Sequence, residues 1–262
     1  MENIWIGVAG ISFIFIMTTM GAALVYIFKK DISPKINTVF LGFASGIMIA
    51  ASVWSLLLPA IAKSESWGAY NFVPAAVGFI IGGLFFVLLD KIVPHFHKGT
   101  NIEEGLRSKL NKNTKLFFAV TIHNIPEGLA VGFAFGAAAV FGTTEAFISA
   151  LGLALGIGIQ NFPEGAAISL PMKGTTGSKN KAFLYGVCSG IVEPVFAVIG
   201  FFLAAFIEVL QPWLLAFAAG AMIFVVAEDL IPDAKLAEFP HLGTFGVMIG
   251  FVLMMILDVA LG

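Results

Sequence analysis

The sequence predicts an all-α integral membrane protein, with eight transmembrane helices in a compact bundle that has inverted internal symmetry. Three observations support this fold class. Of the 262 residues, 59% are hydrophobic and only 11% are charged, whereas a soluble domain has about 25% charged residues. The apolar residues form eight long runs, and the basic residues gather in alternate loops. Together these features exclude a water-soluble fold.

Each apolar run is close to the length of about 20 residues that a helix needs to cross a bilayer. Glycines recur inside the runs, and small residues let helices approach closely in lipid, so we expect tight packing. The glycines that support this are Gly42, Gly46, Gly78, Gly82, Gly83, Gly152, Gly156 and Gly158. The predicted spans are 4–28, 38–62, 72–94, 115–140, 146–171, 183–208, 213–232 and 243–261.

The basic residues indicate how the spans are oriented. Thirteen of the 14 Lys and Arg residues fall in or beside the loops after spans 1, 3, 5 and 7, and Lys63 is the exception. Because basic loops stay in the cytoplasm, both termini are predicted to be extracytoplasmic. The loop at 95–114, which contains His95 and His97, is then cytoplasmic. The expected location is the plasma membrane, which in a bacterium is the inner membrane.

One hexapeptide pattern occurs twice inside apolar runs. Residues 123–128 read His-Asn-Ile-Pro-Glu-Gly, and residues 160–165 read Gln-Asn-Phe-Pro-Glu-Gly. A carboxylate at mid-membrane costs roughly 2.5–3.5 kcal/mol on insertion scales, so a repeated one suggests a paired site. Residues four apart share a helix face, which places His123 with Glu127 and Gln160 with Glu164. Pro126 and Pro163 are expected to break their helices and release carbonyl oxygens.

The two hexapeptides are predicted to lie at the same depth. Each hexapeptide lies about seven to eleven residues from the cytoplasmic end of its helix. At 1.5 Å per residue, this places both roughly 10–17 Å deep in a hydrocarbon core of about 30 Å. Met48 in span 2 and Glu193 in span 6 fall at the same level. We therefore expect groups from four helices to converge near the membrane midplane.

This set of donors suits a divalent transition metal. One imidazole with carboxylate and amide oxygens fits zinc, iron, manganese or cobalt. The imidazole of His123 disfavours magnesium and calcium, which prefer oxygen ligands. Near the cytoplasmic ends we identify a candidate exit site for a departing cation, formed by Asp90, His95, His97 and Glu228, with Asp229 beside them.

The paired motifs on spans 4 and 5 of eight resemble those of the ZIP (Zrt/Irt-like protein) family of divalent metal transporters, and the GufA-like bacterial branch in particular. The similarity extends to the eight spans, the loop with His95 and the Glu193-Pro194 pair on span 6. It implies a single transporter domain over residues 1–262 that carries metal into the cytoplasm by an elevator-type movement of spans 1, 4, 5 and 6 against the others. It also implies a homodimer, and no enzymatic activity or catalytic cofactor.

The resemblance further implies a binuclear metal centre. One metal would be held by Met48, His123, Glu127, Gln160 and Glu164. Its neighbour would be held by Asn124, Glu127, Asn161, Glu164 and Glu193. In this interpretation the metal ions are the transported substrate.

Other interpretations of the same residues are also open. Asn124, Gln160 and Asn161 could simply hydrogen-bond neighbouring helices, and Met48 could fill a gap in the core. An intramembrane hydrolase would need a His-Glu-x-x-His set or an equivalent, which the sequence lacks. A metal-gated channel or sensor could use the same ligands. No Walker loop, dinucleotide fingerprint or nucleic-acid-binding face is evident, so the expected partners are metal ions and lipid.

Overall fold

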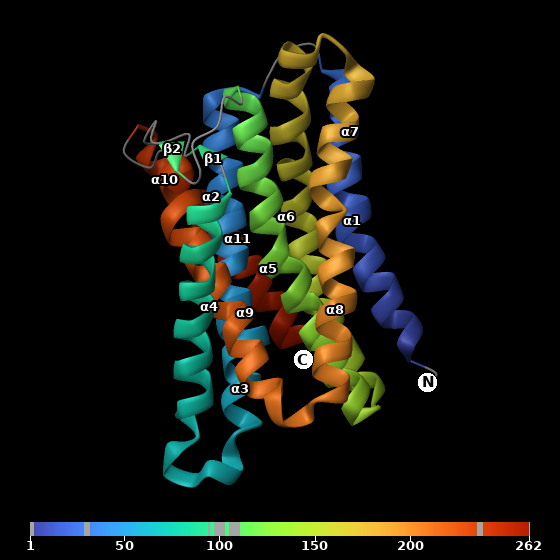
Figure 1. The fold of residues 1–262 in the computed structure, drawn as a ribbon, viewed down its shortest axis with the longest axis vertical. Helices are drawn as coiled ribbons and strands as arrows, with labels where there is room; N and C mark the ends of the chain where they lie inside the picture. Colours follow the sequence, from blue (N-terminus) through green and yellow to red (C-terminus); the bar gives the residue numbers. More distant parts are fainter. Residues whose placement is uncertain are drawn as a thin grey trace.

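The computed structural model describes residues 3–28, 32–93, 95–96, 103–104, 111–234 and 238–261. Long helices standing side by side dominate these residues (Figure 1). The described part of the loop after α4 contributes two short strands, β1 (His95–Phe96) and β2 (Glu103–Glu104), which pair antiparallel.

Among the described residues, eight helical segments are long and apolar enough to cross a membrane, which confirms the predicted fold class. We number them as spans 1 to 8. In order they are α1 (Ile4–Ile27); α2 (Pro34–Ala51) with a π-helical segment at Ser52–Leu57 and α3 (Leu58–Ala62); α4 (Phe72–Ile92); α5 (Lys112–Phe141); α6 (Thr144–Thr176); α7 (Lys179–Gly190) with α8 (Val192–Phe206); α9 (Gln211–Val225) with a π-helical segment at Val226–Leu230 and α10 (Ile231–Asp233); and α11 (Pro240–Leu261). Short 3-10 helices at Glu65–Tyr70 and Glu208–Leu210 precede α4 and α9.

Four helices begin earlier than their apolar runs because polar side chains cap them. Ser33, Asn111, Thr143 and Ser178 each accept a hydrogen bond from a backbone N–H in the first turn of α2, α5, α6 and α7. Such caps satisfy N–H groups that have no partner inside the helix. A count of apolar residues does not register these polar first turns.

The spans pack as two groups of four. The first group, called here the α5/α6 bundle, contains α1, α5, α6, α7 and α8; the second, the α2/α9 bundle, contains α2, α3, α4, α9, α10 and α11. The most extensive helix pairings lie within the bundles, and they are α1 with α6, α5 with α8, α2 with α11 and α4 with α9. Contacts between the bundles are made mainly by α5 and α6, against α9, α11 and α2. We call this boundary the seam.

The pairings have the internal symmetry that the sequence predicts. Exchanging span 1 with 6, 2 with 7, 3 with 8 and 4 with 5 maps each of the four main pairings onto another. Every exchange relates an odd span to an even one, so the two repeats run in opposite directions through the bundle. Spans 2 and 7 also share a local irregularity, because each contains one of the π-helical segments.

Glycines make the close approaches within the bundles. A Cβ atom on Gly21 would lie 1.8 Å from the backbone oxygen of Phe162, and one on Gly82 would lie 2.0 Å from that of Phe217. The other two pairings have equally close contacts through glycines of α5 and α2. Two of the glycines named from the sequence make no such approach: a Cβ on Gly83 would meet nothing within 4 Å, and one on Gly152 would lie 3.4 Å from the backbone oxygen of Leu257, an ordinary contact. The bundles are therefore held together backbone against backbone, as is usual for helices in lipid.

The expectation that Pro126 and Pro163 break their helices is wrong. Both prolines are buried inside continuous helices, α5 and α6. Packed neighbouring helices tolerate the single missing hydrogen bond. The break in this bundle lies instead between α7 and α8 at Ile191, just before Glu193 and Pro194.

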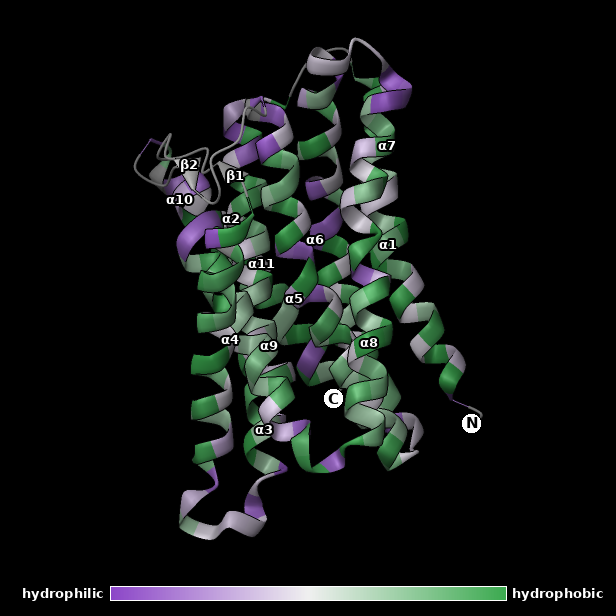
Figure 2. Cartoon of the chain, viewed as in Figure 1, coloured by the Kyte–Doolittle hydropathy of each residue, from purple (hydrophilic) through white to green (hydrophobic). Residues whose placement is uncertain are grey.

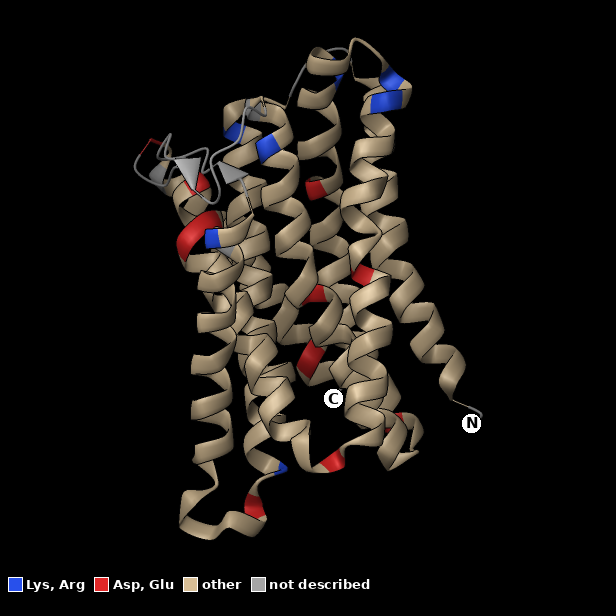
Figure 3. Cartoon of the chain, in the orientation of Figure 1, with Lys and Arg blue, Asp and Glu red and all other residues tan. Residues whose placement is uncertain are grey.

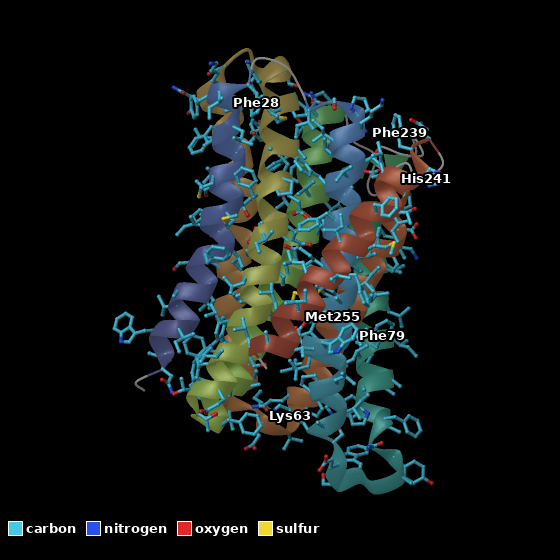
Figure 4. All side chains as sticks on the ribbon, turned by 180° about the vertical axis from the view of Figure 1, so that it is seen from behind. Phe28, Lys63, Phe79, Phe239, His241 and Met255 are labelled. Atoms are coloured by element: carbon cyan, nitrogen blue, oxygen red, sulfur yellow. The ribbon has the colours of Figure 1, made fainter. Side chains whose placement is uncertain are left out.

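Polar and charged residues gather at the two ends and at a few interior points. The helices are hydrophobic along most of their length (Figure 2), and nearly all described Lys residues lie at one end (Figure 3). Lys63, which Figure 4 labels, lies at the opposite end. We call this end, toward which both termini also lie, the outer end, after the orientation that the sequence predicts. Acidic side chains occur in the middle of the bundle as well, and they define the candidate site.

Candidate metal centre

The two hexapeptides touch through Glu127 and Gln160. Glu127 on α5 is 1% exposed, and its Oε1 accepts a hydrogen bond of 2.7 Å from Nε2 of Gln160 on α6. Both side chains project from buried stretches of antiparallel helices, which brings them to one level. The structure thus joins the two halves of the repeated motif directly.

A second carboxylate–amide pair lies one residue further along α6. Nδ2 of Asn161 donates to Oε2 of Glu193 at 2.6 Å, and Oγ1 of Thr18 on α1 donates to Oε1 of Glu193 at 2.9 Å. Glu193 is fully buried in the first turn of α8. Pro194 has no N–H, which favours the helix break at Ile191, and the new helix start offers its positive dipole end to the carboxylate.

His123 contacts the other bundle. Its Nε2 lies 2.9 Å from Oδ2 of Asp229, and its ring lies 6.4 Å from the ring of Phe86 on α4, measured between centroids. Asp229 is buried in the π-helical segment of span 7, whereas its neighbour Glu228 is exposed. The sequence analysis placed Asp229 beside Glu228 at the cytoplasmic exit and did not predict its contact with His123. Local π-helical geometry sets which of two adjacent acids faces inward, and no sequence pattern reports it.

Several oxygen atoms of the two hexapeptides are buried without a hydrogen-bond partner among the described residues. Nδ2 of Asn124 donates to the backbone oxygen of Ser189, but its Oδ1 accepts nothing. The oxygens in this state are Asn124 Oδ1, Glu127 Oε2, Gln160 Oε1, Asn161 Oδ1 and Glu164 Oε2. A buried acceptor with no partner costs about 1–3 kcal/mol, so five in two short segments require an explanation.

Glu164 is the least enclosed of the three carboxylates. Its side chain is partly exposed although its Oε2 is buried, and it lies within electrostatic range of Glu127, Glu193 and His123. Within the described residues, no three His, Cys, Asp or Glu side chains are drawn together in a metal-binding arrangement. Glu127 and Glu193 instead each accept a hydrogen bond from a different amide.

The contacts described above do not include the remaining candidates, some of which are outside the described residues. Met48 is fully buried in α2, within the main hydrophobic core. Asp90 belongs to α4 and His95 to β1, but their side chains are outside the described part of the structure, as is His97 altogether. The candidate exit site thus remains a prediction.

The chain matches the family model described as ZIP Zinc transporter over residues 3–115 and 113–258. Zinc transporter ZIP11 of Homo sapiens is 36% identical, over 100% of this chain and 98% of the relative. Zinc transporter GufA of Myxococcus xanthus is 33% identical, over 94% of each chain. Zinc transporter ZIPB of Bordetella bronchiseptica is 34% identical, over 95% of this chain and 79% of the relative.

These relatives are named as transporters and not as enzymes, and they cover nearly the whole chain. The eight spanning helices and the bacterial relatives identify a multi-pass protein of the plasma membrane. The chain belongs to the ZIP family of zinc transporters, as a GufA-like member.

Proposed function

We propose that this protein carries divalent transition-metal ions, zinc first, across the membrane into the cytoplasm. The observation that carries the proposal is the group of five buried oxygens without partners in the two hexapeptides. They are acceptors only, they come with three carboxylates, and they lie inside helices apolar enough to span a membrane. A dication is the ligand that satisfies such a set, and the relatives named as zinc transporters support zinc.

The proposed site holds two metal ions. One would take oxygens of Glu127, Gln160 and Glu164, with His123 and Met48 as further donors. The second would take Asn124, Asn161 and Glu193 and share the carboxylates of Glu127 and Glu164. The two carboxylate–amide pairs support this division, since Gln160 and Asn161 are consecutive on α6 and each holds a different glutamate. Glu127 keeps a free Oε2 for a metal, whereas both oxygens of Glu193 accept hydrogen bonds, so a metal that ligates Glu193 would compete with Asn161 or Thr18.

The proposed movement is a displacement of the α5/α6 bundle along the α2/α9 bundle. All residues of the two motifs and Glu193 belong to the first bundle, so they would move together. Glycine-mediated packing within each bundle supports treating it as a rigid unit. His123 and Asp229 meet across the seam, and their contact would have to open during the cycle. Asp90, His95, His97 and Glu228 form the proposed cytoplasmic exit.

We further propose that residues 1–262 act as one transport domain, that the protein assembles as a homodimer, and that iron, manganese, cobalt and cadmium compete with zinc. The shared preference of these metals for mixed nitrogen and oxygen ligands supports the competition. Family resemblance supports the dimer, which light scattering of the purified protein in detergent tests directly.

The decisive experiment measures zinc uptake into sealed proteoliposomes. Saturable uptake that is lost in Glu127→Ala and in Glu164→Ala supports a carrier. Glu145→Ala is the matched control, because Glu145 is an exposed acid in the first turn of α6. Flux at channel rates would indicate a metal-gated pore instead. The absence of flux together with measurable hydrolysis would indicate an enzyme.

A further inference from the structure

A small cavity opens at the outer end of the seam. Its volume is about 180 Å³, and both bundles line it. The residues that define it are Ser55 and Pro59 of span 2, Ala134 and Ala137 of α5, Ser149 of α6 and Leu215 of α9.

The cavity points toward the candidate metal centre and stops short of it. Ala134 lies seven residues beyond Glu127 on α5, and Leu153 lies seven residues before Gln160 on α6. Seven helical residues correspond to about 10 Å. Fully buried apolar side chains fill that interval, among them Ala130, Val131, Ala154 and Ile157. The cavity is therefore a shallow vestibule, closed below by packed side chains.

Lys63 lies at the rim of this vestibule, where its side chain contacts two other residues. Its Nζ donates a hydrogen bond of 2.7 Å to Oε1 of Gln211 and lies 4.0 Å from the centroid of the Phe141 ring. Gln211 is itself buried and donates from Nε2 to the backbone oxygen of Ala204 at 2.8 Å. Burial lowers the pKa of the Lys63 ammonium, and the carboxylate of Glu208 opposes this shift.

These contacts cross the seam twice. Lys63 and Gln211 belong to the α2/α9 bundle, whereas Phe141 and Ala204 belong to the α5/α6 bundle. Any displacement of one bundle along the other must separate Lys63 from Phe141 or Gln211 from Ala204. The contacts are thus specific to the bundle arrangement seen here.

We propose that Lys63, Gln211 and Phe141 form an outer latch that keeps dications out of the vestibule while the bundles are in this arrangement. The ammonium at the rim repels cations, and its contact with the Phe141 ring fastens the two bundles together. When the bundles shift, Phe141 leaves, Lys63 swings away from the rim and the vestibule admits a metal ion. This role rests on the proposed import function, which makes the outer end the side of uptake.

The test measures access to the vestibule without requiring transport. A cysteine is placed there by Ala137→Cys, because Ala137 lines the vestibule and is buried, in a Cys188→Ser background because the native Cys188 is exposed. The rates of modification by a cationic and by a neutral methanethiosulfonate of similar size are compared in detergent. Lys63→Met should raise the ratio of cationic to neutral rate roughly fivefold, because it removes a charge within several ångströms of the target.

Three further variants separate charge from structure. Lys63→Arg keeps the charge and should leave the ratio unchanged. Lys181→Met removes an exposed lysine at the opposite end and should also leave it unchanged. Phe141→Leu should raise the ratio part of the way toward that of Lys63→Met, because the ammonium loses one of its two anchors and can leave the rim.

Two results would overturn the latch. One is an unchanged ratio in Lys63→Met. The other is equal acceleration of both reagents in that variant, which would mean that Lys63 blocks only by its bulk. A shifted ratio in a protein that takes up no metal would refute the proposed import and keep the latch. Metal uptake by a protein whose ratio is unchanged in Lys63→Met would refute the latch and keep the proposed import.

Discussion

Replacing Glu127 by Gln is expected to stabilise the metal-free protein. Oε1 of Glu127 accepts from Gln160, while its Oε2 is buried without a partner among the described residues. Glutamine keeps the accepting oxygen and replaces the unpaired one with an NH₂ group, which can donate toward the nearby carboxylate of Glu164. Removing one unsatisfied buried acceptor is worth about 1–3 kcal/mol. For a chain of this size, each kcal/mol raises the unfolding temperature by roughly 2–4 °C.

The same substitution is expected to remove the response to metal. At a zinc concentration one hundred times the Kd, binding stabilises the folded protein by about 2.7 kcal/mol. Zinc should therefore raise the unfolding temperature of the wild-type protein by several degrees. It should leave the unfolding temperature of Glu127→Gln unchanged. Thermal unfolding in detergent, with and without zinc, measures both effects, and Glu145→Gln serves as the exposed control. A variant that unfolds earlier than wild type without metal, or that keeps the full zinc shift, would refute this reasoning.

Three other predictions concern the ligands and the packing. Zinc uptake in proteoliposomes should weaken as the pH is lowered from about 7 to 5, because metal and protons compete for the same imidazole and carboxylates; a flat profile would argue against ligation by His123. Asn161→Asp removes the amide donor that holds Glu193 and adds a negative charge, so the affinity for a second zinc ion should rise in calorimetry, and an unchanged stoichiometry and affinity would contradict the binuclear site. Gly82→Val should abolish folding or lower the unfolding temperature sharply, because its side chain would overlap the backbone of Phe217, whereas Gly83→Val should be tolerated; equal behaviour of the two variants would contradict the packing of α4 on α9.

The periodicity and composition of the sequence predicted what depends on the lipid solvent. Eight apolar runs must become eight helices, because unpaired backbone groups are too costly in a bilayer. The repeated hexapeptide predicted that α5 and α6 meet, and Glu127 and Gln160 do so. Glycines indicated close packing in advance because a missing side chain is visible in the sequence.

The details that the sequence did not reveal depend on three-dimensional packing. Proline chemistry predicted breaks at Pro126 and Pro163, but buried neighbours keep both helices continuous. The π-helical segment that contains Asp229 has no sequence signature, so the contact of Asp229 with His123 was not predicted. Individual ligand assignments likewise depend on side-chain orientations, which the order of residues alone does not determine.

The contacts at the two ends of the seam bear on how a rigid two-bundle carrier could work. His123 meets Asp229 toward the inner end, and Lys63 meets Phe141 at the outer rim. Each contact joins one bundle to the other, and glycine packing makes each bundle stiff along its length. If the bundles slide as units, the two contacts cannot loosen independently, since both depend on the same displacement. Loss of either contact should therefore change access at both ends of the site, which is the coupling that a carrier needs and a simple pore does not.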